Sequence, residues 1–225
     1  MISNANSKLI RSLSRKKNRD QQKLFVVEGE KMVLELLEGM AEVVPQVQEI
    51  FATGEWITGN NHLIRGAGTK ATEATDQELR KVSNLVTPQK VLALVHIPDV
   101  SFSVDEVQSG PVLGFEAVRD PGNLGTIIRT ADWFGIRNIL CTPDSVDLYN
   151  PKVVQATMGA MVRVKVNYLN LESLLKDPAM QNKPTYGTFP EGENIYETTL
   201  EENPMILFGN ESKGLSPRFD PLIRS

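Results

Sequence analysis

Short apolar runs along the chain alternate with stretches in which apolar residues recur at helical spacing. Runs of four to eight apolar residues are typical of buried strands, whereas a spacing of three or four residues is typical of amphipathic helices. In the first part of the chain these patterns predict strands over 24–27, 47–52 and 91–97 and helices over 3–22, 30–37 and 75–82. A further stretch, 57–68, is rich in glycine and asparagine and predicts neither element. This part is therefore predicted to be a small α/β domain.

The same alternation continues in the second half with longer periods. It predicts strands over 112–118, 138–141, 161–166, 185–189 and 205–208 and helices over 123–135, 150–158 and 171–180. Proline, serine, glycine and acidic residues are concentrated between the two halves, as is typical of a linker. The predicted organisation is an α/β domain over 1–98, a linker over 99–111 and a second α/β domain over 112–225.

The second half is organised around the corner DPGNLGTIIRTADWFG, residues 120–135, which follows the apolar run 112–118. Asn123 is predicted to be the N-cap of a helix, because its side-chain oxygen can accept from free backbone amides, and Gly135 is predicted to end it. A strand that leads through such a turn into a helix leaves amides at the carboxyl edge of a sheet, where open α/β sheets bind ligands. Arg129, one and a half turns into the helix, can reach back over that edge.

Charge is distributed unevenly along the chain. The net charge is −4, but residues 8–23 contain seven basic residues and one acidic residue, so this tract carries +6 and the remainder −10. A basic tract on an acidic body is compatible with docking on structured RNA, because phosphate binding depends on concentrated positive charge. The alternative is a cationic helix face that is simply solvated, and charge alone favours this alternative.

Cysteine and histidine usage argues against a disulfide or a metal site. Cys141 is the single cysteine, and His62 and His96 are the only histidines, so the chain offers no cluster with metal-ligand spacing. The chain also has no apolar run long enough to span a membrane and no apolar core near its N-terminus that could serve as a secretory signal. The sequence therefore predicts a cytoplasmic protein without a metal.

Two glycine loops follow two separate predicted strands. The loop GNESKGLS, 209–216, is not a phosphate-binding P-loop, because Lys213 precedes the glycine instead of following it. Gly122 and Gly125 likewise lack the spacing of the dinucleotide fingerprint. Both loops carry polar residues that could converge on one ligand, and the alternative for each loop taken singly is an ordinary turn.

Together, the motifs resemble a known family. The segments NLGTIIRTA (123–131) and LFGNESKGL (207–215) resemble the first and second signature motifs of the SpoU (TrmH-like) family, the ribose 2'-O-methyltransferases of the SPOUT class. The segment DLYNPKVVQATMG (147–159) is similar to the middle stretch of that family, and RKKNRDQQKLFVVEGEKMV (15–33) to its N-terminal substrate-binding domain. The resemblance covers nearly the whole chain, with the motifs in the family's order.

The resemblance implies a homodimeric RNA methyltransferase that uses S-adenosylmethionine, acts on rRNA or tRNA and has a trefoil knot in its C-terminal domain. Carried over by position, it implies three catalytic residues: Asn123, Arg129 and Glu211. The implied cofactor-binding residues are Thr188, Leu207, Gly209, Asn210 and Leu215, and the implied RNA-binding residues are Arg15, Lys16, Lys17 and Arg19. Periodicity alone predicts an unknotted α/β sheet.

The resemblance also predicts a departure and leaves alternatives. The family's third motif should follow Ile223, so the knot is expected to be incomplete, together with an incomplete cofactor site, a weakened dimer surface, or both. The alternative function is a non-catalytic RNA-binding protein that retains the fold. A third possibility, a nucleotide-dependent hydrolase, is disfavoured because this sequence has neither a phosphate loop nor metal ligands. Arg129 could stabilise the alkoxide or merely pair with Asp132, and Glu211 could accept a proton or merely cap its own loop.

Overall fold

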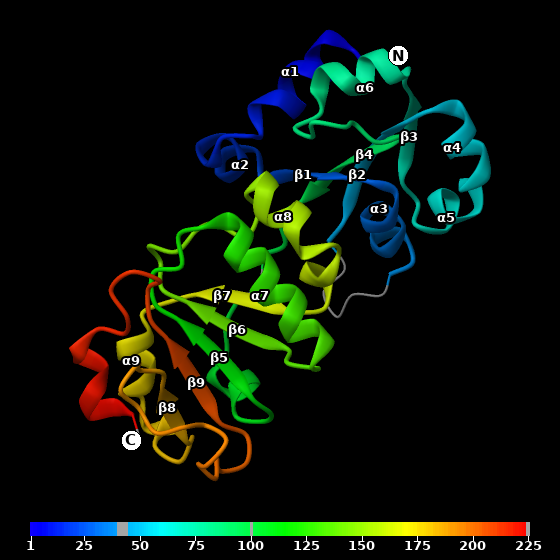
Figure 1. Cartoon of the computed structure of the whole chain (residues 1–225). Helices are drawn as coiled ribbons and strands as arrows, with labels where there is room; N and C mark the ends of the chain where they lie inside the picture. Colours follow the sequence, from blue (N-terminus) through cyan, green and yellow to red (C-terminus); the bar gives the residue numbers. More distant parts are fainter. Residues whose placement is uncertain (40–44, 100, 224–225) are drawn as a thin grey trace. The chain divides into compact units, whose positions relative to one another are not determined.

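The computed structural model describes residues 1–39, 45–99 and 101–223. Residue 100 of the predicted linker and residues 224–225 at the end of the predicted second domain lie outside the described residues. The chain divides into two compact units, of which the first comprises Met1–Asp99 and Asp147–Arg163 and the second Val100–Val146 and Val164–Ser225 (Figure 1). The stretch 147–163, which the sequence groups with the second domain, therefore packs within the first unit.

The first unit is built on a four-stranded mixed sheet in the order β1-β4-β2-β3. Its strands are β1 (Leu24–Glu28), β2 (Val47–Ala52), β3 (Lys70–Glu73) and β4 (Val91–His96). Strand β4 is antiparallel to both β1 and β2, and β3 is parallel to β2. Three of these strands are those predicted from the apolar runs. Strand β3 was not predicted, because it is a polar edge strand with no buried residue.

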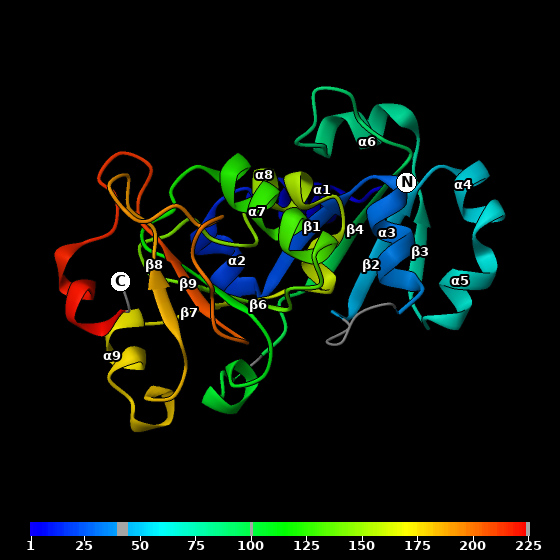
Figure 2. The same cartoon turned by 60° about the horizontal axis from the view of Figure 1, so that its bottom comes forward.

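Helices cover both faces of this sheet. They are α1 (Asn4–Ser12), α2 (Lys16–Gln22), α3 (Glu30–Leu37), α4 (Gly54–Gly59), α5 (Asn61–Gly66), α6 (Asp76–Val82), α8 (Pro151–Thr157) and the 3₁₀ helix η2 (Ala160–Val162). One core joins the sheet to α3, α4, α5 and α8, and another joins it to α1 and α6. Figure 2 shows α3, α4 and α5 grouped beside β2 and β3. Thr75 and Glu78 form the predicted capping box of α6.

The predicted helix over 3–22 is interrupted, which corrects the sequence interpretation. Helix α1 ends at Ser12 and α2 begins at Lys16. The carbonyl oxygens of Leu13 and Ser14 accept hydrogen bonds from the Arg19 guanidinium, at 2.8 and 3.0 Å, instead of from amides of a following helical turn. A side chain that returns from six residues away thus ends the first helix, and residue spacing does not reveal such a contact.

The second unit has a five-stranded, fully parallel sheet in the order β7-β6-β5-β9-β8. Its strands are β5 (Val112–Phe115), β6 (Asn138–Cys141), β7 (Lys165–Tyr168), β8 (Thr185–Gly187) and β9 (Met205–Phe208). The predicted strand over 161–166 is wrong in its first half, because residues 160–162 form η2 and β7 begins only at Lys165. The apolar residues there serve the core of the first unit instead of a strand.

The remaining helices of the second unit are α7 (Pro121–Trp133), α9 (Leu171–Leu175) and the 3₁₀ helices η1 (Val104–Val107), η3 (Pro178–Met180) and η4 (Pro217–Leu222). In Figure 1, α7 lies over β6 and β7, and α9 lies beside β8 and β9. The predicted helix over 171–180 is interrupted before Pro178, whose ring cannot continue a helix. The predicted linker contains η1, and Val107 of η1 is fully buried in the second unit's core.

The N-terminus of α7 differs from the prediction. Asp120 is the N-cap and Pro121 occupies the first turn, so Asn123 lies at the third helical position. The Asp120 carboxylate accepts from the Asn123 backbone amide at 2.9 Å. Because aspartate caps the helix, the side chain of Asn123 is left available for another partner. Gly135 follows the end of the helix with φ +72°, as predicted for a C-terminal stop.

The order of the strands determines where ligands can bind. From β5 the chain proceeds outward through β6 and β7, and later returns on the other side through β8 and β9. The sequence order therefore reverses between β5 and β9, which are hydrogen-bonded neighbours. In parallel sheets a crevice opens at the carboxyl ends of the two strands that flank such a reversal. The loops after β5 and β9 lie at this edge.

Candidate active site

The two glycine loops predicted from the sequence meet at this edge. The side-chain amide of Asn123, in the first turn of α7, donates a hydrogen bond of 3.1 Å to Oε1 of Glu211, in the loop after β9. These residues are 88 positions apart in the chain. The structure therefore brings together two of the three predicted catalytic residues, and both are exposed to solvent.

The loop after β9 closes on itself through its backbone. Asn210 and Gly214 exchange two hydrogen bonds between their backbone amides and carbonyls, at 3.0 and 2.8 Å. Gly209 precedes this closure, and a Cβ atom at Gly209 would overlap the backbone of Gly214 and Leu215. Glycine is therefore required at position 209 to let the two ends of the loop approach one another.

Asn210 fixes the interior of the same loop. Its Oδ1 atom accepts from the backbone amides of Ser212 and Lys213, at 3.0 and 3.2 Å. Its Nδ2 atom donates to the carbonyl of Ala117 at 2.9 Å and to Oε2 of Glu211 at 3.2 Å. Asn210 thus caps the loop, which is the alternative that the sequence left open for Glu211. The Glu211 carboxylate accepts from two side-chain amides instead.

Ala117 connects the loops that follow three strands. It has φ +56°, in the left-handed region that L-residues seldom adopt. Its amide donates to Thr142 Oγ1 at 2.8 Å, after β6, and its carbonyl accepts from Asn210 after β9. A conformation of this kind persists only where the surroundings hold it, and such residues cluster at functional sites.

A cavity of about 490 Å³ opens between these loops. Charged residues of both signs line it, namely Glu116, Arg119, Asp120, Asp144, Glu211 and Lys213. The cavity lies entirely within the second unit and at the carboxyl edge of its sheet. Its size and polar lining suit a polar ligand.

Arg129 lies on α7 with its side chain exposed. Within the described part of the chain, the structure gives its guanidinium no hydrogen bond or ion pair, so the predicted alternative of a stabilising ion pair is not observed. An exposed guanidinium on the helix that begins at the site is available to bind a phosphate. Its role in catalysis stays a prediction.

The five predicted cofactor-binding residues are grouped at the ends of β8 and β9. Both the amide and the hydroxyl of Thr188 donate to the carbonyl of Leu207, at 3.0 and 3.1 Å. The side chains of Leu207 and Leu215 are buried in one core, so the Leu207 side chain is closed to a ligand. Gly209 lies against the backbone of Leu215. The set fits one ligand bound by backbone groups, and cofactor contact stays a prediction.

Metal-ligand grouping and the ionisation of Cys141 are the remaining points of candidate chemistry. Among residues 1–39, 45–99 and 101–223, no three histidine, cysteine, aspartate or glutamate side chains are grouped as metal ligands would be. Burial raises the pKa of the Cys141 thiol to about 12. A thiol that stays protonated is a poor nucleophile.

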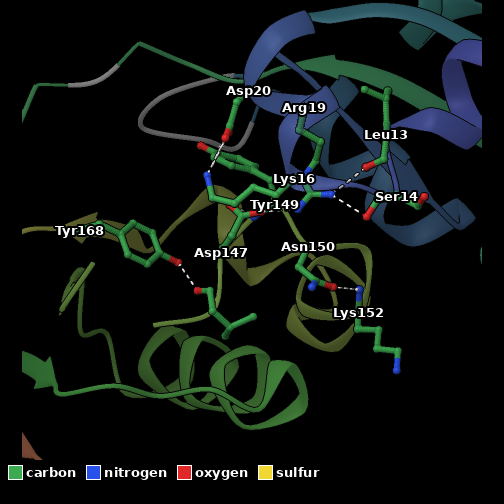
Figure 3. Close-up of polar contacts among 11 residues, drawn as sticks. Leu13, Ser14, Lys16, Arg19, Asp20, Asp147, Tyr149, Asn150, Lys152 and Tyr168 are labelled. Carbon is green, nitrogen blue, oxygen red and sulfur yellow. Dashed lines mark hydrogen bonds and ion pairs between the residues drawn. The ribbon is translucent and has the colours of Figure 1, made fainter. Parts of the chain in front are cut away.

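The predicted RNA-binding residues differ in exposure. Arg15, Lys16 and Lys17 are exposed, with Lys16 in an ion pair with Asp20 on the next turn. Arg19 is only 2% exposed, and its guanidinium contacts Asp147 at 2.5 Å as well as the carbonyls of the α1–α2 turn (Figure 3). Nη1 and Nη2 of Arg19 thus serve the protein's own fold, whereas its Nε atom is buried without a hydrogen-bond partner among the described residues. RNA contact by Arg19 stays a prediction.

Sequence reasoning missed two residues that shape the site. Ala117 joins three loops, and Glu116 directly before it is a buried carboxylate that lines the cavity. A charged residue directly after an apolar strand was a signal for Glu116. Nothing in the sequence marks Ala117, because its importance depends on a backbone conformation.

Sequence profiles assign both parts of the chain. The profile of the SpoU rRNA Methylase family matches residues 111–222, and that of the MRM3-like substrate binding domain matches residues 4–93. The 23S rRNA (guanosine(2553)-2'-O)-methyltransferase RlmP of Bacillus subtilis is 28% identical over 206 residues, covering 91% of this chain and 79% of RlmP.

Solved structures agree with the profiles. A TrmH-family protein from Porphyromonas gingivalis is 32% identical, with a TM-score of 0.85 over all of this chain and 87% of that one. An rRNA methyltransferase from Sinorhizobium meliloti with bound AdoMet shares the fold, with a TM-score of 0.82 at 24% identity over 99% of this chain and 85% of that one. Fold and site thus define an α/β protein whose second unit has a parallel sheet with a polar site at the strand-order reversal. The chain belongs to the SpoU (TrmH-like) family of RNA methylases.

Proposed function

We propose that this protein transfers a methyl group from S-adenosylmethionine to a ribose 2'-hydroxyl of structured RNA, with rRNA as the substrate class. The contact between Asn123 and Glu211 is the observation that carries the proposal, because it unites the two signature loops of the family at one sheet edge. A protein that only bound RNA would not need an amide and a carboxylate aligned beside an open cavity.

The chain's own residues have separate tasks in this proposal. S-adenosylmethionine supplies a methyl group activated by a sulfonium, and backbone groups near Thr188, Leu207 and Gly209 would hold it. Asn123 orients the Glu211 carboxylate by donating to one of its oxygens. Glu211, water or a substrate phosphate takes the proton of the ribose hydroxyl.

Arg129 stabilises charge in this proposal. A guanidinium stays protonated in proteins, so Arg129 cannot serve as the base. It can bind a substrate phosphate through two parallel hydrogen bonds and stabilise the oxygen on which negative charge develops. Its exposure on the helix that starts at the site supports this assignment.

Substrate docking and assembly complete the proposal. Arg15, Lys16 and Lys17 give the first unit an exposed basic helix that suits the phosphate backbone of RNA. We also propose that the protein is a homodimer, as the family resemblance suggests, and that it is cytoplasmic, as its RNA substrate suggests. No helix among the described residues is long and apolar enough to cross a membrane.

Methyl transfer tests the proposal directly. Labelled S-adenosylmethionine and ribosomal RNA are incubated with the protein, and label should appear in nucleotides that resist alkaline cleavage. Arg129→Lys keeps the charge but loses the paired geometry, so transfer should fall at least tenfold. Full activity in Arg129→Lys would refute bidentate anchoring. RNA binding without any transfer by the unaltered protein would favour the non-catalytic alternative.

A further inference from the structure

Glu116 is the first residue after β5, at the strand-order reversal. Its backbone amide donates to the carbonyl of Phe208 at 2.9 Å, so it is aligned with the end of β9. The residue is only 5% exposed, and it lines the same cavity as Glu211.

Three donors surround the Glu116 carboxylate. Oε2 accepts from the backbone amide of Ser216 at 2.7 Å, and Oε1 accepts from the Ser216 hydroxyl at 2.6 Å. Oε1 also accepts from the Arg218 guanidinium at 2.5 Å. A buried charge is tolerated only when it is paired and hydrogen-bonded, so Glu116 and these donors constrain one another.

These contacts attach the far end of the Glu211 loop to β5. Ser216 lies two residues beyond Gly214, where the loop closes, whereas Asn210 at the near end is held by Ala117. Two consecutive residues, Glu116 and Ala117, therefore hold both ends of the loop that carries Glu211. We propose that Glu116 is a positioning residue for methyl transfer, which sets the place of the Glu211 carboxylate opposite Asn123. This inference rests on the proposed function.

A purely structural role is the competing explanation, and Glu49 provides a matched control. Glu49 is a carboxylate of β2 that is 7% exposed. It accepts from the Thr72 hydroxyl at 2.6 Å, the Lys70 ammonium at 2.8 Å and the Asn6 amide at 3.4 Å. Glu49 is thus a buried carboxylate that, like Glu116, has three donors, namely a hydroxyl, a cation and an amide, although its amide is a side-chain amide and its cation an ammonium. It lies in the sheet of the first unit.

The test compares Glu116→Gln with Glu49→Gln in the full chain. Glutamine preserves the shape of the side chain, but its NH₂ group is a donor. That group must face one of the donors from which the carboxylate oxygens accepted hydrogen bonds. We expect kcat at saturating S-adenosylmethionine and rRNA to fall about tenfold to a hundredfold in Glu116→Gln, because a displacement of about 1 Å at a catalytic group has that effect. Glu49→Gln should keep its kcat. Equal kcat values in the two variants and the unaltered protein would overturn the inference.

A second measurement does not depend on activity. Amide hydrogen exchange over 210–216 should become at least several-fold faster in Glu116→Gln and stay unchanged in Glu49→Gln. Ser216→Ala removes only one donor, and it should lower kcat in the same direction if Glu116→Gln fails to fold. Unchanged exchange in folded Glu116→Gln, or unchanged kcat in Ser216→Ala, would refute the role. Absence of transfer by the unaltered protein would refute the proposed function, and exchange would still test the loop attachment.

Discussion

Cys141 is the single cysteine of the chain, and its environment makes it a probe of folding. Burial in β6 raises the pKa of the thiol to about 12. At pH 8 roughly one thiol in ten thousand is then ionised. We expect the native protein to react with a chromogenic disulfide reagent far more slowly than urea-unfolded protein, which should react fully. Rapid reaction of the native protein would contradict the burial.

Gly209 should tolerate no side chain. A Cβ atom there would overlap the backbone of Gly214 and Leu215, so Gly209→Ala forces the loop after β9 to open. We expect methyl transfer to fall by at least tenfold, together with a loss of about 1–3 kcal/mol in the free energy of unfolding. The control is Gly59→Ala, because Gly59 has open space around it and should be unaffected. Similar losses in both variants would refute the close-approach argument.

Individual site residues were predictable from sequence only where a motif carries them. Asn123 and Glu211 were identified from the two signature segments, and the structure joins them. The capping role assigned to Asn123 was wrong, because Asp120 precedes Pro121 and takes the cap. Ala117 could not be identified, since no residue pattern indicates an alanine in a left-handed conformation.

At the scale of elements, the Arg19–Asp147 ion pair connects α2 with the segment before α8. Arg19 is nearly inaccessible and also binds two carbonyls, so Arg19→Ala removes the guanidinium from the buried Leu13 carbonyl and from the partly buried Asp147 carboxylate. We expect a loss of about 3 kcal/mol in the free energy of unfolding, measured by urea denaturation. Lys17→Ala removes an exposed charge from the same helix and should cost less than about 0.5 kcal/mol. Equal losses in the free energy of unfolding for the two variants would show that the buried ion pair stabilises the fold no more than an exposed charge does.

Strands and helices whose buried residues form a continuous apolar run or recur at helical spacing were predicted well. Strands β6 and β9 and helix α3 have the predicted limits, because each is a compact apolar or amphipathic run. The predicted strand over 161–166 failed because its apolar residues contact the core of the first unit. The pattern of hydrophobic residues shows that a side chain is buried, but not which partner buries it.

At the scale of the molecule, the α/β architecture of both halves and a polar edge on the second sheet followed from the alternation of strands and helices. The site between β5 and β9 also depends on the strand order, which periodicity does not determine. Nor did the sequence show that 147–163 packs with the first unit. Side-chain contacts such as Phe25 with Tyr149, whose ring centroids are 4.7 Å apart, form that attachment. Long-range pairing of this kind leaves no local signal.

Two exposed aromatic side chains at the end of α7 suit the interface of the proposed homodimer. Trp133 and Phe134 at the end of α7 are 85% and 73% exposed, although α7 buries Leu124, Ile128 and Ala131 on another side. Adjacent exposed aromatic side chains are typical of interaction surfaces, because leaving them in water is unfavourable. Burial of each ring in an interface would contribute roughly 1.5–3 kcal/mol per subunit. We therefore expect this pair to lie in the dimer interface.

Sedimentation velocity can test this surface. The unaltered chain should sediment as a dimer, and the double variant Trp133→Ser/Phe134→Ser should shift to a monomer at the same concentration. Tyr196→Ser is the control, since Tyr196 is also a highly exposed aromatic residue but lies in the segment between β8 and β9. A double variant that remains dimeric would place the interface elsewhere, whereas an unaltered chain that is monomeric would refute the dimer itself. Loss of the dimer by Tyr196→Ser alone would instead assign the interface to the β8–β9 segment.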